Sequence, residues 1–233
     1  KFSKYDFLAM PVVDNEERMV GIITFDDVLD VIAEENEEDF SKMAAMQPIE
    51  DSYFKTSVFT HAKKRIGWLL VLMLSATITG NLLTKYEEAF QAIPILVSFI
   101  PMLMSTGGNC GSQSSTTIIR GLATGEIQFK DFFKAVFKEF RISLIISVIL
   151  AVTNGLRIFI FYKNLQLSIV ITLSIIGTVI IAEFIGCALP LIAKKVKLDP
   201  AIMATPLIST IVDTCSMLIY FQFATMIFSE LRH

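Results

Sequence analysis

The chain has 233 residues, of which 53% are hydrophobic and 18% are charged, and its mean hydropathy is +0.61. Soluble domains carry about 25% charged residues, so this composition excludes an ordinary soluble domain and indicates a protein with long membrane segments. The formal net charge of −3 comes from acidic and basic residues that are segregated along the chain, and nothing in this distribution indicates a nucleic-acid partner.

The chain begins without a methionine, in the middle of a pattern, and we expect it to be a piece of a longer protein. Its first apolar stretch lies more than 60 residues from the start, so no signal peptide is expected. Cys110, Cys187 and Cys215 fall in apolar segments without metal-ligand spacing. They predict buried thiols and no disulfide framework.

Residues 1–33 have the pattern of the end of a soluble α/β domain. Met10–Val13 and Met19–Thr24 predict two strands, separated by a polar turn at residues 14–18. A helix is expected to follow, with Thr24 or Asp26 as its N-terminal cap.

The expected helix runs into an acidic stretch, which together with a linker we assign to residues 34–65. Eight acidic residues lie between Asp26 and Asp39. Most such runs are solvated helix faces, which is the first interpretation. Like charges three and four residues apart destabilise an isolated helix, however, and divalent cations would relieve that repulsion. An acidic ion sensor is therefore the second interpretation, and the pattern does not decide between them.

Residues 66–233 predict an all-α membrane domain with five transmembrane helices per chain. The five apolar segments are Ile66–Leu83, Ala92–Ile119, Ile142–Tyr162, Ile169–Ala193 and Ala201–Phe228. The second segment is interrupted by Pro94, Pro101 and Gly107–Gly108. Phenylalanines at helical spacing between residues 129 and 140, with lysines among them, predict an amphipathic helix at the membrane interface.

The distribution of lysine and arginine in the short loops predicts the orientation. Lys63–Arg65, the loop at 120–141 and Lys194–Lys197 are basic, whereas the loops on the other side carry few basic residues. We therefore expect a multi-pass protein of the inner or plasma membrane. Its N-terminus would be cytoplasmic, and five spans would leave its C-terminus outside.

One carboxylate, Asp213, lies near the middle of the last apolar segment. Such a group costs about 2.5–3.5 kcal/mol at membrane depth, so it usually faces a partner or a water-filled path. Thr205, Ser209, Ser216 and Tyr220 recur with it at helical spacing and predict a polar stripe on one helix face. The alternative is that Asp213 is protonated, or paired with a neighbouring helix, for structural reasons.

The second apolar segment contains the polar run Gly107-Gly-Asn-Cys-Gly-Ser-Gln113. Polar groups at membrane depth are tolerated where they are buried in protein or line a wet cavity. Tight helix packing explains the glycines, but it does not explain Asn109 and Gln113, whose oxygens lie on one helix face. This pattern favours a pore lining or pore mouth.

With these residues, the sequence resembles the MgtE family of magnesium channels and transporters. The resemblance rests on Gly107–Gln113, Arg120–Thr124, Leu198–Ala201, Pro206–Leu207 and Ser209–Asp213. In addition, Gly21–Ile32 resembles the end of a second CBS domain that leads into the acidic connecting helix of that family.

The resemblance implies a homodimer in the lipid bilayer, with one ion path on the two-fold axis formed mainly by the second and fifth segments. It implies Mg²⁺ as both the transported ion and a regulatory ligand. The implied pore residues are Asp213, Ser209, Thr205 and Asn109. The implied cytoplasmic magnesium sensor consists of Asp27, Asp30, Glu35, Glu38 and Asp39, with Asp6 in addition.

The leading hypothesis is a Mg²⁺-selective channel that passes hydrated Mg²⁺ into the cytoplasm down its electrochemical gradient and is gated by cytoplasmic Mg²⁺. Mg²⁺ gives up its water reluctantly, so a pore should offer few direct ligands. Two Asp213 carboxylates in a dimer would repel each other, and a dication between them would remove that repulsion. Because the sensor is truncated in this piece, we expect closure by cytoplasmic Mg²⁺ to be weakened or absent.

The alternative is a proton- or sodium-coupled secondary transporter of divalent cations. Glu183 would suit a proton relay, although a purely structural role for this residue is equally open. An enzyme is not expected, because no nucleophile–base pairing or metal-ligand motif is evident. A non-transporting receptor would leave the Asp213 stripe without a purpose.

Overall fold

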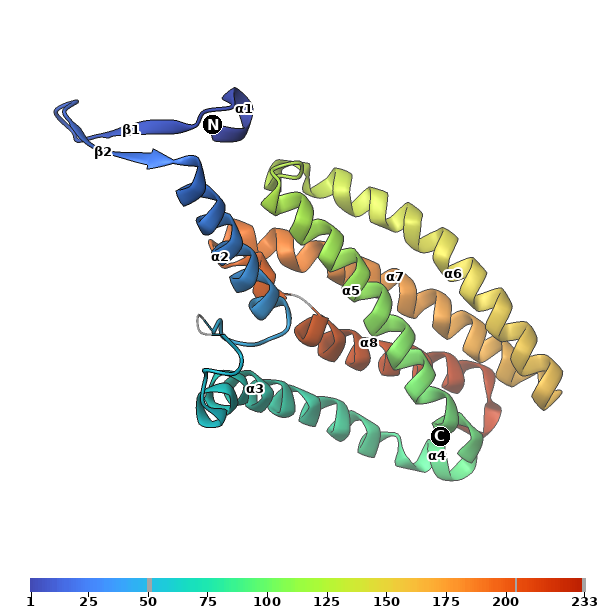
Figure 1. Cartoon of the computed structure of the whole chain (residues 1–233). Coiled ribbons are helices and arrows are strands. Elements are labelled where there is room, and N and C mark those ends of the chain that lie inside the picture. The colour runs from blue at the N-terminus through green and yellow to red at the C-terminus, as the bar shows by residue number, and fades with distance from the viewer. Residues whose placement is uncertain (50–51, 204, 232–233) are drawn as a thin grey trace.

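The computed structural model describes residues 1–49, 52–203 and 205–231, and it is mostly helical (Figure 1). The strands are β1 (Ala9–Val13) and β2 (Met19–Thr24). The α-helices are α1 (Phe2–Tyr5), α2 (Phe25–Met43), α3 (Val58–Lys85), α4 (Glu87–Ala92), α5 (Ile100–Ala123), α6 (Phe132–Tyr162), α7 (Leu165–Lys195) and α8 (Thr205–Ile227). The 3₁₀ helices are η1 (Pro94–Phe99), η2 (Phe129–Asp131), η3 (Pro200–Met203) and η4 (Ser229–Leu231).

Local hydrogen bonds explain the N-terminal hairpin and the start of α2. β1 and β2 are antiparallel, and in the turn between them the Asp14 carboxylate accepts from the Arg18 backbone N–H at 3.0 Å. Thr24 and Asp27 form a capping box at the start of α2, in which the Thr24 backbone N–H donates to Asp27 Oδ2 at 2.8 Å. The predicted order of strand, turn, strand and helix is confirmed.

Among the described residues, four helical stretches are long and apolar enough to cross a membrane: α3, η2 with α6, α7, and η3 with α8. α5 has 24 residues, which at about 1.5 Å per residue would also reach across a hydrocarbon core of about 30 Å. Its Ser, Thr, Asn and Gln side chains make its composition too polar for α5 to be counted among these four stretches. The expected membrane protein is therefore supported, whereas the expected number of five spans is not confirmed.

The helices extend beyond the predicted apolar segments. α3 begins at Val58, so it includes the basic residues that were expected in the linker. The predicted interfacial helix is η2 together with the first turns of α6, and the expected boundary at residues 33/34 lies inside α2. Apolar runs mark where lipid begins, but Lys, Arg and Glu are good helix formers that extend a helix past the hydrocarbon.

The expected break in the second segment is wrong at Gly107–Gly108. α5 is continuous from Ile100 to Ala123, and only the part around Pro94 is separate, as η1. Pro101 stands in the first turn of α5, where a proline needs no intrahelical N–H bond.

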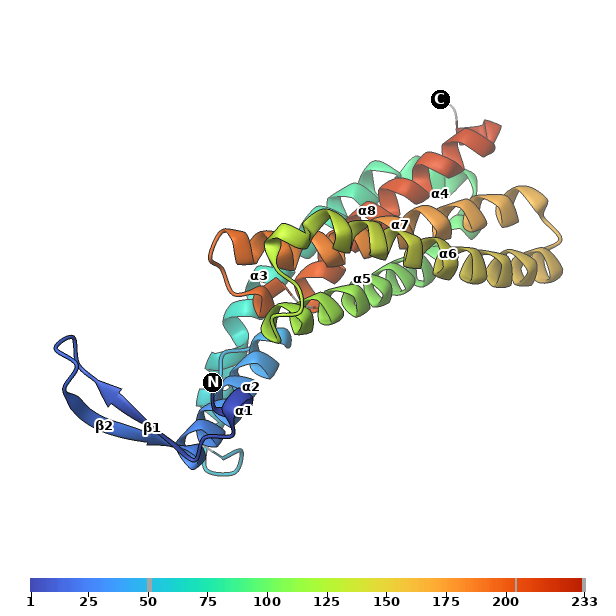
Figure 2. The same cartoon turned by 90° about the horizontal axis from the view of Figure 1, so that it is seen from above.

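Three helices form the centre of the bundle. α5, α7 and α8 pack on one another, with α6 against α7 at one edge and α3 against α8 at the other edge (Figure 1). The hairpin and α2 project from one end of the bundle (Figure 2). The basic connections from α5 to α6 and from α7 to α8 lie at this same end, whereas α4 and the end of α8 lie at the opposite end.

The contact between α5 and α7 depends on small residues. A Cβ added at Gly186 of α7 would lie 2.3 Å from the carbonyl oxygen of Gly111 on α5. One turn away, Ser114 Oγ donates to the Glu183 carbonyl oxygen at 3.2 Å. The two backbones therefore touch at this crossing, as is usual where small residues pack membrane helices.

Candidate functional site

A groove of about 420 Å³ lies between α5 and α8. Most of the side chains that line it are polar, and the two helices that form it carry the predicted pore residues. The lining residues are Met104, Ser105, Gly108, Asn109, Ser112 and Gln113 of α5, and Ser209 and Asp213 of α8. The structure therefore brings Asn109, Ser209 and Asp213 to one place.

Close packing of α8 on α5 positions this groove. A Cβ at Gly108 would lie 3.3 Å from Ser209 Oγ, so a larger residue would press against the Ser209 side chain. Gly108 is buried at this contact, whereas Asn109 and Gln113 are exposed on the neighbouring face of α5. The glycines of this run thus pack the helices and its amides line the groove, whereas the expected pore lining stays a prediction.

The groove is rich in hydrogen-bond acceptors. Ser112 Oγ donates to the Gly108 carbonyl oxygen at 2.7 Å, so its single proton is used and its lone pairs remain for a ligand. The side-chain oxygens of Asn109 and Gln113 and the carboxylate of Asp213 can also accept. A hydrated cation points its water hydrogens outward, so a lining of acceptors suits such an ion.

The predicted polar stripe on α8 does not continue along the groove. Ser216 is buried, and its Oγ donates to the Val212 carbonyl oxygen at 2.7 Å. Tyr220 is fully buried and donates to the Leu96 carbonyl oxygen at 2.9 Å. The α8 face that is open at Asp213 is covered further along by η1, which carries Leu96.

The predicted role of Thr205 stays a prediction. This residue is the first of α8, and its side chain lies outside the part of the chain that the structure describes.

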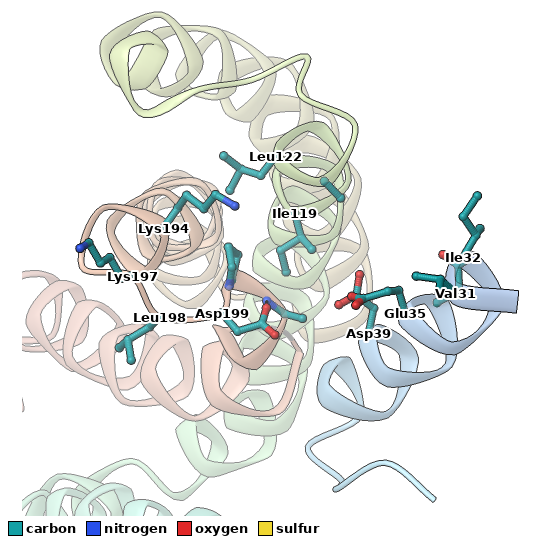
Figure 3. A pocket seen from close by; sticks show the side chains of 14 residues that line it. Val31, Ile32, Glu35, Asp39, Ile119, Leu122, Lys194, Lys197, Leu198 and Asp199 are labelled. Carbon is teal, nitrogen blue, oxygen red and sulfur yellow. Dashed lines mark hydrogen bonds between the residues drawn. The ribbon is translucent and has the colours of Figure 1, made fainter. Parts of the chain in front are cut away.

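A second cavity, of about 800 Å³, separates α2 from the membrane bundle (Figure 3). The carboxylates of Glu35 and Asp39 on α2 point toward the loop that carries Asp199 (Figure 3). Lys194 and Lys197, at the end of α7 and just beyond it, line the other side of this cavity.

An ion pair holds α2 against this loop. Lys42 Nζ lies 2.6 Å from Asp199 Oδ2 and also pairs with Glu38. Asp199 Oδ1 accepts from the Ala201 backbone N–H at 2.9 Å, which ties the same carboxylate to η3 ahead of α8. The end of α2 is thereby connected to the segment that leads into the groove helix.

The charges at this junction are not balanced. Burial raises the pKa of Asp39, and the neighbouring Asp199 charge raises it further, while Lys42 opposes both effects only in part. Burial alone would raise the pKa of Asp199, but the hydrogen bonds from Lys42 and Ala201 lower it. Lys42 therefore compensates Asp199 and leaves Asp39 as a half-buried carboxyl with surplus negative charge nearby.

The other predicted sensor residues are spread along α2. The hydrogen bonds that Asp27 accepts from the Thr24 hydroxyl and N–H lower its pKa, and this residue caps the helix. Asp30 and Glu35 are exposed, and Asp6 follows the short helix α1. Among the described residues, no three acidic, His or Cys side chains gather closely enough to hold a metal ion. The predicted sensor set is thus not brought together in this single chain.

Two further carboxyl groups meet inside the bundle. Glu183 of α7 is 2% exposed and Glu139 of α6 is 7% exposed, and their side chains hydrogen-bond to each other. The two carboxyl groups form a second acidic contact inside the bundle, away from the α5–α8 groove. Glu183 was singled out in the sequence, but its contact with Glu139, which was expected in an interfacial helix, was not predicted.

Sequence reasoning also missed several residues that the structure places at these sites. Ser105 and Ser112 line the groove, and their spacing from Asn109 could have identified them. Asp199 stood in a recognised motif without an assigned role. Lys42 gave no signal, because its partner lies 157 residues away in the sequence.

Membrane-length helices enclosing a groove of hydrogen-bond acceptors define a multi-pass membrane protein. Residues 100–223 match the MgtE family, described as divalent cation transporters, and residues 1–34 match the CBS domain. The chain belongs to the MgtE family, and the resemblance seen in the sequence is confirmed. This is a family of transporters and not of enzymes.

Three curated relatives are each described as a magnesium transporter MgtE. The Bacillus subtilis protein is 38% identical over 222 residues, which are 95% of this chain and 49% of the relative. The Thermus thermophilus protein is 34% identical over 223 residues, covering 96% of this chain and 49% of the relative. The Enterococcus faecalis protein is 32% identical over 222 residues, covering 95% of this chain and 48% of the relative. The chain thus spans about half the length of these relatives.

Proposed function

We propose that this chain forms the Mg²⁺-conducting part of a magnesium channel. Hydrated Mg²⁺ would pass between α5 and α8 into the cytoplasm, down its electrochemical gradient. The α2 end of the bundle would face the cytoplasm, because the basic connections gather there and favour that side. An inward-negative potential of 100 mV would contribute about 4.6 kcal/mol for each dication.

The observation that carries this proposal is the lining of the α5–α8 groove. It combines one carboxylate, that of Asp213, with neutral acceptors from Asn109, Ser112 and Gln113. Mg²⁺ holds its water shell tightly, so a lining that bonds to the shell and places few charges beside it can select the ion without trapping it. The relatives described as magnesium transporters support Mg²⁺ as the substrate.

The groove also supports a homodimer. In one chain, Ser105, Asn109 and Gln113 are exposed beside apolar helices, and polar groups facing lipid are costly. A second copy placed on this face by two-fold symmetry would cover them and bring two Asp213 carboxylates to one axis. A dication between the two carboxylates would then offset their repulsion.

Flux into liposomes that contain the purified chain tests this function. We expect Mg²⁺ entry that grows with an inside-negative potassium diffusion potential and does not change when a pH or sodium gradient is imposed at zero potential. Empty liposomes and liposomes with an unrelated membrane protein give the background. Entry that needs a proton or sodium gradient would overturn the channel mechanism.

One observation favours the second candidate, a proton- or sodium-coupled transporter of divalent cations. The carboxyl groups of Glu139 and Glu183 meet inside the bundle, and such a buried pair would suit a proton relay. The pair does not line the α5–α8 groove, so coupling would require a second path. The flux experiment separates the two candidates, because only the coupled transporter responds to the proton gradient.

We further propose that cytoplasmic Mg²⁺ binds the acidic face of α2 and holds the pore closed. Asp39 fits this role because it carries surplus negative charge beside Asp199, which a dication would neutralise. Asp199 precedes η3 and α8, so docking of α2 can act on the groove helix directly. The remaining sensor residues, Asp27, Asp30, Glu35 and Glu38, would bind Mg²⁺ with parts of the assembled dimer.

Two substitutions at this junction are expected to act in opposite directions. Without divalent cations, Asp199→Asn removes the ion pair between Lys42 and Asp199 and should lower the equilibrium constant for docking of α2 about fivefold, the effect of roughly 1 kcal/mol for a surface ion pair. Asp39→Asn removes an uncompensated charge and should increase docking. The rate of disulfide formation between cysteines introduced at Asn36 and Ala123, which line the same cavity, measures docking.

The pH dependence and the response to Mg²⁺ sharpen this test. Because the pKa of Asp39 is raised, docking should strengthen as the pH falls through that raised value. Because the pKa of Asp199 is lowered, the stabilisation of docking by its charge is fully present above its ordinary pKa. This stabilisation is lost only as the pH falls through the lowered value. Added Mg²⁺ should promote docking in the parent and in Glu37→Gln, a control outside the cavity, but not in Asp39→Asn. Equal responses in all three would contradict a role for Asp39.

A further inference from the structure

The outer surface of α6 carries an unusual combination of groups near its first turns. Lys134, Lys138 and Arg141 follow at spacings of four and three residues, which places them on one helix face. Phe133, Phe137 and Phe140 occupy the neighbouring face and are 83%, 62% and 44% exposed. α6 packs on α7 at the edge of the bundle and is not one of the two helices that form the α5–α8 groove (Figure 1).

The basic side chains stand above an apolar groove. Lys138 and Arg141 line a groove of about 490 Å³ together with Ile142, Leu144 and Ile145. A second groove of about 500 Å³, between α6 and α7, is lined only by apolar side chains, four of them phenylalanines. The charged groups of Lys138 and Arg141 therefore lie at one end of apolar grooves that could accommodate hydrocarbon chains.

The position of these groups along α6 matches the edge of a bilayer. Arg141 and Lys163 are separated by about 33 Å at the rise of an α-helix, close to the hydrocarbon thickness of about 30 Å. Arg141 would then lie where the acyl chains meet the headgroups, with Lys138 and Lys134 in the headgroup layer. The exposed phenylalanines would enter the same layer.

The local charge is positive and largely uncompensated. Lys134 lies 3.7 Å from Asp131, whereas Lys138 and Arg141 form no ion pair with any described residue. The acid in this turn, Glu139, is buried against Glu183 and points away from the basic face. A phosphate is the group that Arg and Lys at this depth would bind.

We propose that this surface of α6 binds an anionic phospholipid in the leaflet at the α2 end of the bundle. The phosphate lies between Lys138 and Arg141, and an acyl chain follows Ile142 and Ile145. A second copy of the chain fits this face poorly, because a two-fold contact through it would bring the basic side chains of both copies into one interface. The inference requires only that α6 crosses the bilayer and is independent of the transported ion.

A tryptophan placed beside the site can report which lipid is bound. The single Trp of the chain, Trp68, is changed to Phe, and Phe137→Trp is added next to the basic face. The protein is reconstituted in phosphatidylcholine vesicles that contain a minority of phosphatidylglycerol, with bromine on the chains of one lipid at a time. We expect brominated phosphatidylglycerol to quench the new tryptophan far beyond its share of the lipid. This preference should fall about fivefold for each of the changes Lys138→Gln and Arg141→Gln.

Lys163→Gln, at the other end of α6, is the matched control and should keep the full preference. Quenching in proportion to lipid content, or a preference that survives Lys138→Gln with Arg141→Gln, would overturn the proposal. Quenching by neither lipid would also overturn it, because the face would then be covered by another copy. Quenching by brominated phosphatidylcholine in the double variant checks that the tryptophan still faces lipid.

Discussion

Replacing Asp213 with asparagine is expected to reduce Mg²⁺ entry into liposomes more than tenfold. Among the described residues that line the α5–α8 groove, the Asp213 carboxylate is the only formal charge. Beside a hydrated dication at roughly 5 Å, one carboxylate contributes about 1.7 kcal/mol even with the dielectric constant of water. Loss of this attraction corresponds to a factor of about 16, and a dimer would lose it twice.

The same change should also weaken selectivity. The attraction scales with ionic charge, so a monovalent ion at the same place loses about half as much, or roughly 0.8 kcal/mol per carboxylate. The ratio of Mg²⁺ to K⁺ entry should therefore fall about fourfold for each carboxylate removed. Paired fluxes of the two ions through Asp213→Asn liposomes measure this ratio. A uniform decrease of both fluxes would instead point to a misfolded or closed protein.

Glu183→Gln distinguishes this site from the buried carboxyl pair. Glutamine keeps the shape of the side chain and can still hydrogen-bond to Glu139, so the bundle should stay intact. The channel proposal expects Mg²⁺ entry to persist in Glu183→Gln and to fall in Asp213→Asn. The reverse pattern would place the essential carboxylate between α6 and α7 and would favour the proton-coupled transporter.

Features that depend on neighbours in the sequence were predictable. The hairpin and the start of α2 follow from a turn centred on Asp14 and from the capping box of Thr24 and Asp27. Helical spacing predicted that Asn109 and Gln113 share a face, and the cost of a charge in lipid drew attention to Asp213. The structure places these three residues on one groove.

Features that depend on the meeting of distant segments were not predictable. Ser216 and Tyr220 have the same helical spacing as Ser209 and Asp213, yet η1 and α5 cover them. Spacing defines a helix face, but only packing decides which part of that face stays open. The contact between Lys42 and Asp199 likewise requires that α2 fold back onto the loop before η3. Apolar content alone placed the starts of α3 and α6 too late in the sequence. The charged residues at Lys63–Arg65 and Lys134–Arg141 precede the apolar segments but are already helical.

Gly186→Ala is expected to lower the free energy of unfolding by about 3 kcal/mol, at the upper end of the cost of overpacking. The new methyl group would lie 2.3 Å from the Gly111 carbonyl oxygen and 3.0 Å from Ser114 Cβ. A flexible side chain could turn aside, but a helix backbone cannot. α5 would have to move away from α7, which would displace the opposite face of α5 that carries Asn109 and Gln113. Unfolding by denaturant in detergent, followed by circular dichroism, measures the loss.

Gly80→Ala in α3 is the matched control, because the added methyl group meets no atom within 4 Å in the chain. There the usual helix preference of alanine over glycine should apply and stabilise α3 by up to about 1 kcal/mol. The two variants make the same chemical change in a helix interior and should differ in sign. If Gly186→Ala were as stable as Gly80→Ala, α5 and α7 would not be in backbone contact. The α5–α7 contact could then not be what positions α5 beside α8. If Gly186→Ala is less stable and also shows less Mg²⁺ entry, the α5–α7 contact is needed to position the face of α5 that lines the groove.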